Sequence, residues 1–463
     1  MDRKKLTGLI LGIAILVLIW IIPAPTGLPP AGKNALGLLI AGIIFWVTEV
    51  VPLSISAMFL MVMLPFYGVT AKLADVFKDF MSPVIFFVIA TFGMTTIIMT
   101  TNLATRLTGK LLTWAGDNSK KLVLGFIAAS ALLSTVMSNV PTCALFLALA
   151  LTVLECTGAK PGQSNLGKCL MIGIPFGVMI GGGATPAGTS INIMAMSLLE
   201  QSSKIHITFL GWMIMAVPMT VIMVLISWWC LVTIFKPEPI KLSDLESMHK
   251  TVQDLGPMSF KEKKVIYIIF AMLVLWILST WFPVLDTTMV AILGLVVMFL
   301  PGINVINWTE FVGGVSWNIV LLIGGVQAIA TGILKGGAAA WMVNTVLAGA
   351  AHWGATLTNL GASILMTIMH ALIPVGPAIV GMSTAPIAGV AGLAGTSAAG
   401  LTVMVAFMSA ITFILPIDCV PLLTYGKGYY TMGDFIKAGL IPTIALILYC
   451  TFILPMLAAL IGL

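Results

Sequence analysis

Residues 134–143 read S-T-V-M-S-N-V-P-T-C and lie between two apolar runs, L-G-F-I-A-A-S-A-L-L before them and A-L-F-L-A-L-A-L-T-V-L after them. A proline removes a backbone hydrogen bond from a helix, and backbone groups released in this way cannot face lipid. The whole apolar stretch, about residues 122–158, is also too long for one helix across about 30 Å of hydrocarbon. The pattern predicts a re-entrant hairpin that enters and leaves the membrane on one side, with residues 134–143 at its tip.

The composition is that of a membrane protein. The chain has 463 residues, of which 60% are hydrophobic and only 8% are charged, whereas a soluble domain has about 25% charged residues. Apolar runs of about 18–20 residues recur from end to end, and the short alternating segments of a barrel are absent. We therefore predict an all-α polytopic membrane protein. The six cysteines are scattered singly, so neither a disulfide framework nor a zinc site is predicted.

About eleven transmembrane helices are predicted, together with two re-entrant hairpins. The second hairpin is the long apolar stretch at about 358–398, which also has polar residues and Pro near its middle. Gly and Pro break the fifth and the tenth crossing. The crossings fall at about 6–24, 34–48, 52–67, 82–101, 168–200, 208–234, 264–282, 287–303, 317–334, 400–432 and 436–460.

The basic residues give the orientation. With the N-terminus in the cytoplasm and with each hairpin returning to its own side, only five of the 22 Lys and Arg residues fall outside, so 17 fall inside. Such an excess of basic residues is typical of cytoplasmic loops. It would be weaker if either hairpin were a single crossing, because every later segment would then change sides. We expect a multi-pass protein of the cell membrane. The five outer residues are Lys33, Lys72, Lys78, Lys204 and Lys335.

The order of features repeats along the chain. Residues 1–234 contain six crossings and the first hairpin, residues 235–263 form a hydrophilic cytoplasmic linker, and residues 264–463 contain five crossings and the second hairpin. In each part a crossing is followed by an amphipathic stretch, a hairpin and a broken crossing. Because the first part has one more crossing before the matching portion, the two copies point in opposite directions. Such an inverted repeat is typical of secondary transporters.

Four non-helical interruptions mark the predicted substrate site: residues 138–142, 181–192, 383–386 and 416–421. Helix N-termini at such breaks suit anions, and Ser, Thr and Asn add short donors without a permanent charge. Packing is the alternative for any single segment, but four in symmetric order favour a site that binds a small dicarboxylate at both ends. The expected substrate-binding residues are Ser138, Asn139, Thr142, Thr189, Ser383, Thr384 and Pro421.

Few ionisable residues fall within the predicted membrane segments. Asp418 lies at a helix break, where an acid is a functional candidate by default: it could bind a cation, take up a proton or pair with Lys427. His370 lies in an arm of the second hairpin, where a structural role is favoured over one in the cavity. Glu49 lies near a helix end and is interpreted as a capping or snorkelling group.

Several function classes are excluded or disfavoured. The segment G-A-T-P-A-G-T-S at 183–190 mimics a phosphate loop but lacks its lysine and follows no strand, so neither nucleotide binding nor an ATP-driven pump is predicted. No HExxH motif or paired-aspartate arrangement is present, which argues against an enzyme. The net charge of +6 is distributed over the predicted cytoplasmic loops and does not indicate nucleic acid. An ion channel fits hairpins on both sides less well than alternating access.

The chain resembles the divalent anion–sodium symporters, also called INDY-like carboxylate transporters, over nearly its whole length. The resemblance rests on T-E-V-V-P-L at 48–53, S-N-V-P-T at 138–142, G-G-G-A-T-P-A-G-T at 181–189 and F-I-L-P-I-D-C-V-P at 413–421. It implies a homodimer in which a transport domain, built from hairpins and broken helices, moves as an elevator against a scaffold. It also implies a Na⁺ site formed by Ser134, Ser138, Asn139 and the Gly188 carbonyl.

The chain departs from the family pattern in ways that resemble its exchanger branch, the citrate:succinate and 2-oxoglutarate:malate antiporters. The hairpin tips of the family carry Ser-Asn-Thr, but here Val140 stands third in the first tip and Thr384 replaces the asparagine expected in the second. We therefore expect Na⁺-independent exchange of dicarboxylates such as malate, succinate or 2-oxoglutarate, with no cofactor. Na⁺-coupled di- or tricarboxylate symport and transport of sulfate or tartrate remain the alternatives.

Overall fold

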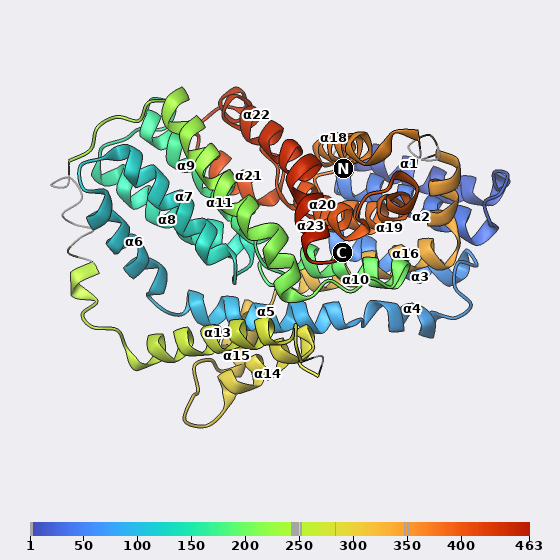
Figure 1. Cartoon of the computed structure of the whole chain (residues 1–463), viewed down its shortest axis with the longest axis horizontal. Helices are drawn as coiled ribbons and strands as arrows, with labels where there is room; N and C mark the ends of the chain where they lie inside the picture. The colour runs from blue at the N-terminus through green and yellow to red at the C-terminus, as the bar shows by residue number, and fades with distance from the viewer. Residues whose placement is uncertain (1–2, 242–249, 251, 283, 347–348, 350–351) are drawn as a thin grey trace.

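The computed structural model in Figure 1 describes residues 3–241, 250, 252–282, 284–346, 349 and 352–463, and these residues form helices and connecting turns without a strand. The elements are α1 (Arg3–Ile21), α2 (Pro30–Thr48), α3 (Leu53–Phe66), α4 (Leu73–Phe80), α5 (Pro83–Met99), α6 (Leu103–Ala115), α7 (Ser119–Ser134), α8 (Asn139–Cys156), α9 (Asn165–Gly183), α10 (Ser190–Ser203), α11 (Phe209–Ile234), α13 (Phe260–Leu278), α14 (Thr287–Phe299), α15 (Trp308–Gly314), α16 (Trp317–Lys335), α17 (Ala338–Trp341), the π-helix η2 (Met342–Val346), α18 (Gly354–Leu372), α19 (Gly376–Ala394), α20 (Ala398–Ala410), α21 (Cys419–Tyr425), α22 (Met432–Leu448), the π-helix η4 (Tyr449–Ile453) and α23 (Leu454–Leu460).

The helices are those of a polytopic membrane protein. Within the described residues, nine helices are long and apolar enough to cross a membrane, and the bent pair α4–α5 makes a tenth if it is counted as one span. These helices do not correspond one to one with the eleven predicted crossings. They include three hairpin arms, α8, α18 and α19, whereas α3, α14 and α20 are apolar but shorter.

Four interruptions divide the helices that surround the centre. Turn one, residues 135–138, joins α7 to α8, and turn two, residues 373–375, joins α18 to α19. Break one, residues 184–189, separates α9 from α10, and break two, residues 411–418, separates α20 from α21. Turn one and break one lie within the stretches predicted from the sequence. Break two begins earlier than predicted, because α20 already ends at Ala410.

The second hairpin tip was predicted in the wrong place. Ser383 and Thr384 lie in the middle of α19, which continues through Pro386 without interruption. The chain reverses instead at Ile373–Val375, where Pro374 forces the preceding residue into extended backbone and Pro377 stands in the first turn of α19. Turn two therefore presents Val375 and Gly376, and no Ser or Asn side chain.

The same packing relation occurs twice in the fold. The central helix α5 packs against α14 and α15 from the second part of the chain, and the central helix α16 packs against α3 and α4 from the first. Figure 1 shows α5 beside α13–α15 and α16 beside α3 and α4. Each part of the chain therefore supplies the neighbours of the other part's central helix.

Small residues bring α7 and α9 into unusually close contact. Gly173, Gly177 and Gly181 recur every four residues on α9 and face α7. A Cβ at Gly173 would come within 2.9 Å of the Ile127 side chain, and a Cβ at Gly181 would overlap the Ala131 carbonyl oxygen. Such a stripe of small residues lets two membrane helices approach with backbone nearly touching backbone.

The predicted linker and the second amphipathic stretch are only partly described. Residues 242–249 and 251 of the linker, and residues 347–348 and 350–351 of the stretch at 335–353, lie outside the described residues. The end of the linker is fixed by Arg106 of α6, whose guanidinium donates to the Gly256 carbonyl at 2.6 Å and to the buried Glu262 carboxylate at 2.9 Å.

Candidate substrate site

Turn one and break one are joined directly. The hydroxyl of Thr185 donates to the carbonyl oxygen of Thr135. Gly188 lies so close to turn one that a Cβ there would come within 2.8 Å of the Ser134 carbonyl oxygen. The last residue of break one, Thr189, precedes α10, so the beginning of α10 lies beside the first hairpin turn.

Asn139 presents a free donor at this junction. Its Oδ1 accepts a hydrogen bond from Ser134 Oγ at 2.9 Å and lies against Gly182, where no side chain would fit. Its Nδ2 has no hydrogen-bond partner in the part of the chain that the structure describes, and neither does the hydroxyl of Ser138. Both residues are half-buried. The structure therefore brings the predicted Ser134, Ser138, Asn139 and Gly188 together.

Turn two also lies close to the α10 N-terminus. A Cβ at Gly376, the first residue of α19, would lie 2.5 Å from Ile191 Cδ1 at the start of α10 and 2.6 Å from the Ser409 carbonyl oxygen. Ser190 precedes Ile191, so the free end of α10 lies between the two hairpin turns. An anion placed there would meet helix ends from both parts of the chain.

Three of the helices that begin at the centre have no side-chain cap. Ser138, Thr189 and Val375 occupy the N-cap positions of α8, α10 and α19, and none of their side chains accepts a hydrogen bond from the helix that follows. The first backbone N–H groups of a helix have no intrahelical partner. These N–H groups and the helix dipoles therefore make the junction attractive for a negative group.

Several other predicted residues have their polar groups engaged. The Thr142 hydroxyl donates to the Ser138 carbonyl oxygen at 2.9 Å, one turn back in its helix. The Thr384 hydroxyl donates in the same way to the Val380 carbonyl oxygen at 2.8 Å. The Pro421 carbonyl accepts from Tyr430 Oη at 3.1 Å. Ser383 is buried, and its hydroxyl contacts Met369 Sδ at 3.8 Å.

Asp418 pairs with His370. The Oδ2 atom of Asp418 lies 3.5 Å from His370 Nε2, and Oδ1 accepts from the Val420 N–H at 3.2 Å, which caps α21. Of the three predicted roles, the ion pair with Lys427 is wrong, because His370 is the partner. His370 is buried, and the sequence interpretation missed its contact with Asp418.

An oxygen-rich cluster surrounds Ser134 at the junction of α7 and α9. The sequence interpretation missed Gly182, Thr185 and Asn192, although all three lie in the quoted Gly-rich break. Asn192 Nδ2 donates to the Gly182 carbonyl at 2.9 Å and to the Thr185 carbonyl at 2.8 Å, while its Oδ1 is buried without a hydrogen-bond partner in the described chain. Neutral oxygen ligands without a carboxylate fit Na⁺ better than a divalent cation.

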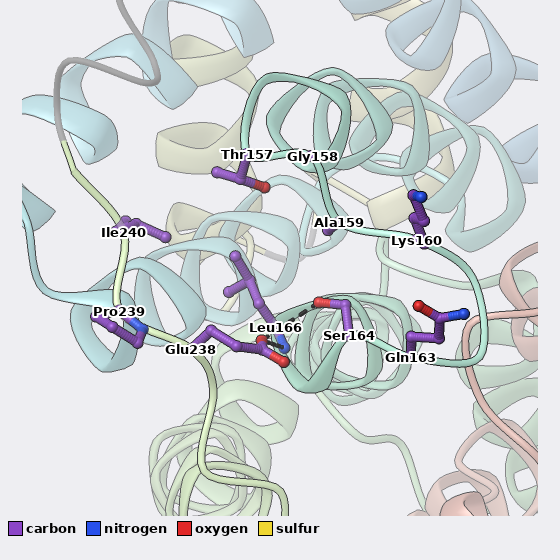
Figure 2. A pocket seen from close by; sticks show the side chains of 10 residues that line it. All are labelled: Thr157, Gly158, Ala159, Lys160, Gln163, Ser164, Leu166, Glu238, Pro239 and Ile240. Carbon is purple, nitrogen blue, oxygen red and sulfur yellow. Dashed lines mark hydrogen bonds between the residues drawn. The ribbon is translucent and has the colours of Figure 1, made fainter.

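A surface hollow of about 370 Å³ lies away from this junction, between the end of α8, the start of α9 and the segment after α11. Figure 2 shows Glu238 reaching from that segment to Ser164 and Leu166. Its carboxylate accepts from the backbone N–H groups of Asn165 and Leu166, both at 2.6 Å. The α9 N-terminus is thus already occupied by a carboxylate of the protein, which leaves no anion site there.

Replacing Glu238 with glutamine should remove an acid-sensitive support of α9. Burial acts to raise the pKa of Glu238, but its hydrogen bonds, chiefly those from the Asn165 and Leu166 N–H groups with a further one from Ser164, together outweigh burial and hold the pKa below its ordinary value. A lowered pKa contributes stability above the unfolded pKa that is lost as the pH falls through the folded pKa. Because the residue is at the surface, the expected loss at pH 7 is about 0.5–1 kcal/mol.

The measurement is the unfolding midpoint of the purified protein in detergent between about pH 7 and pH 3. The wild-type midpoint should fall more steeply on the acid side than that of Glu238→Gln. Equal slopes for the two proteins would contradict this role.

Comparison with known proteins decides the family. The sodium:sulfate symporter transmembrane region matches residues 3–461. The chain belongs to this family. Its members include the divalent anion–sodium symporters that the motifs at 48–53 and 138–142 indicated, so the predicted resemblance is confirmed and the chain is a secondary transporter of that family.

Curated relatives of this symporter family member include dicarboxylate transporters. The sodium-dependent dicarboxylate transporter SdcS of Staphylococcus saprophyticus is 26% identical over 361 residues, which cover 73% of this chain and 69% of the relative. The SdcS protein of Staphylococcus aureus strain USA300 shows the same identity and coverage. A membrane protein of Cupriavidus necator is 23% identical over 467 residues, 94% of this chain and 89% of the relative.

Solved structures share the fold of this symporter family member. The Alcanivorax borkumensis YdaH transporter superposes with a TM-score of 0.59 at 13% identity, covering 100% of this chain and 98% of its own. Neisseria gonorrhoeae MtrF superposes with a TM-score of 0.55 at 12% identity, covering 98% and 95%. Both likenesses concern the arrangement of helices alone.

Proposed function

We propose that the protein exchanges dicarboxylates such as malate, succinate and 2-oxoglutarate across the cell membrane without Na⁺. The observation that carries the proposal is the uncapped N-terminus of α10 between the two hairpin turns. Free donors of Ser138 and Asn139 lie beside it, and Thr189 precedes it. The name of the SdcS relatives supports dicarboxylates as the substrate class.

One carboxylate of the substrate would accept hydrogen bonds from Asn139 Nδ2, from Ser138 Oγ and from the first N–H groups of α8. The other would lie toward the beginnings of α10 and α19. Helix dipoles and neutral donors hold such a dianion without a buried lysine or arginine, so the site itself adds no permanent charge to the moving part.

Exchange follows from the difference between the two turns. Turn two presents Val375 and Gly376 in place of hydroxyl and amide side chains, so among the described residues it does not reproduce the set of neutral oxygen ligands that surrounds Ser134. A carrier whose empty anion site is not balanced by cations returns at a high cost. Obligatory exchange avoids that step, because each crossing carries a dianion.

The proposed architecture for this exchange is an elevator. Residues 1–234 and 264–463 would form the two inverted copies, joined by the cytoplasmic linker 235–263, with the N-terminus in the cytoplasm. The hairpins α7–α8 and α18–α19 and the broken helices α9–α10 and α20–α21 would move together against the rest of a homodimer. The close contact of α7 with α9 supports the movement of hairpin one and its broken helix as one body.

Na⁺-coupled symport is the second candidate. It is favoured by the oxygen cluster of Ser134, Asn139, Thr185 and Asn192, and by the name of the sodium-dependent relative SdcS. The buried Oδ1 of Asn192 in this cluster lacks a partner in the described chain. Transport of another divalent anion, such as sulfate or tartrate, is the third, because donors on helix ends recognise charge more than shape.

Counterflow in proteoliposomes distinguishes these candidates. Purified protein should take up labelled succinate into vesicles loaded with unlabelled succinate, equally well in choline and in Na⁺ buffers, and should take up none into empty vesicles. Uptake into empty vesicles that requires Na⁺ would favour symport. Competition by sulfate and tartrate during the same counterflow ranks the anions.

A further inference from the structure

When His370 is neutral and Asp418 is ionised, no proton lies between the two side chains at their contact. His370 Nδ1 lies 2.7 Å from the Met408 carbonyl oxygen, which can only accept, so Nδ1 carries a hydrogen. In neutral His370 the other nitrogen, Nε2, is then an acceptor. It faces Asp418 Oδ2 at 3.5 Å, and an ionised carboxylate can only accept as well. One additional proton between the two atoms converts this repulsion into an ion pair.

The two groups are removed from water, which makes the proton important. His370 is 2% exposed, and the Asp418 side chain is 14% exposed. Nε2 of His370 has no other partner in the described residues. Without the proton the pair has a net charge of −1 at membrane depth, and with it the pair is neutral. Desolvation disfavours the charged form and therefore opposes its movement through the hydrocarbon.

The other ionisable groups around the pair do not neutralise it. Cys419 Sγ lies 3.1 Å from Asp418 Oδ1, and the neutral thiol of Cys143 on α8 donates to the Val420 carbonyl. Tyr430 Oη donates to Pro421, and Tyr449 of η4 donates to Met215.

The charges on the neighbouring helices lie elsewhere. Lys168 of α9 and Asp434 of α22 pair with each other at 3.2 Å, at the beginnings of their helices. Glu155 of α8 and Lys437 of α22 are exposed. Among the described residues, His370 is therefore the group that compensates Asp418.

The pair occupies a mechanically important position. His370 lies in the last turn of α18, one arm of hairpin two, and Asp418 is the last residue of break two. In the first part of the chain, hairpin one and break one are joined by neutral groups. Thr185 contacts Thr135, and Gly188 contacts Ser134. Only the second junction therefore depends on a proton.

The His370 side of the pair has room for a water molecule. A cavity of about 20 Å³ adjoins His370 and is lined in part by Thr367, Met408, Thr412 and Thr443. This volume is sufficient for about one water molecule, and three of these residues offer hydroxyl partners. A water molecule in this cavity would give His370 a partner for proton exchange.

We propose that His370 and Asp418 together bind one proton from water, and that the transporter crosses the membrane with this pair protonated. The inference rests on the proposed function, since it makes the exchange of dicarboxylates proton-dependent while leaving it Na⁺-independent. The bound dianion favours the protonated pair, because its negative charge opposes a second uncompensated charge nearby.

The test is malate counterflow with equal pH on both sides, since both malate carboxyls are largely ionised above about pH 6. Between pH 6.5 and pH 8.5 the wild-type rate should fall roughly tenfold, as expected for one titrating histidine–carboxylate pair. His370→Gln and Asp418→Asn should each lower this dependence to less than about twofold. The control is His206→Gln, which removes an exposed His206–Glu200 pair of similar geometry, 3.4 Å, and should keep the wild-type profile.

A second readout does not require transport. Malate binding to wild-type protein in weakly buffered detergent should take up protons, as reported by an indicator dye, and Asp418→Asn should not. No proton uptake by the wild type, or a wild-type pH profile in His370→Gln, would overturn the proposal. If the variants do not fold, the wild-type dye measurement alone decides. If counterflow requires Na⁺, Na⁺-independent exchange fails, and the pH profile measured in Na⁺ still tests the pair.

Discussion

Replacing Asn139 with alanine is expected to weaken succinate binding by roughly 10- to 150-fold and to leave the protein folded. Its Nδ2 is a free, half-buried donor at turn one, and a hydrogen bond to a charged group contributes about 1.5–3 kcal/mol. The same substitution leaves Ser134 Oγ without its acceptor, so the oxygen cluster also loses a ligand. Equilibrium binding of labelled succinate to the purified protein measures the effect.

The matched control is Asn359→Ala. Asn359 is another buried asparagine, in α18, and its Oδ1 accepts from Thr396 Oγ1 at 3.0 Å. This variant should be less stable and should bind succinate as the wild type does. If the two variants lose the same affinity, the loss reflects general destabilisation, and Asn139 does not bind substrate.

Replacing Gly181 with alanine should prevent normal packing of hairpin one. The new methyl group would overlap the Ala131 carbonyl oxygen, and backbone cannot rotate away as a side chain can. The helices α7 and α9 would have to separate along the whole stripe, which we expect to cost about 3 kcal/mol or more. The yield of monodisperse protein and its unfolding midpoint are the measurements.

Gly313→Ala is the matched control, because Gly313 is also helical, in α15, and a Cβ there meets no atom within 4 Å. It should behave as the wild type or be slightly more stable, since alanine favours helix over glycine. Normal yield and midpoint of Gly181→Ala would show that α7 and α9 are not packed as described.

The sequence predicted what depends on local signals. The polar residues and Pro141 marked turn one, and the Gly-rich run marked break one, because a helix interrupted at membrane depth needs residues that satisfy its backbone. The same reasoning failed for turn two. Pro386 resembled Pro141 in its context but is accommodated within the buried α19, and the denser signal of Pro374, Gly376 and Pro377 was overlooked.

Contacts between distant segments could not be read from the sequence. His370 and Asp418 are far apart in the chain, and only the packing of α18 against α20 brings the imidazole to the break before α21. Pairing with Lys427, one of the three roles considered for Asp418, relied on nearness in sequence. The glycine stripe of α9, in contrast, has a regular spacing that sequence inspection could have recognised.

The reciprocal packing of α5 and α16 has a consequence for biogenesis. Helices α3 and α4 find α16, and α14 and α15 find α5, only after most of the chain has been synthesised. The first half therefore enters the membrane with its eventual contact surfaces uncovered, where chaperones and proteases of the bilayer can reach them. Two separately produced halves should consequently accumulate only when they are made in the same cell.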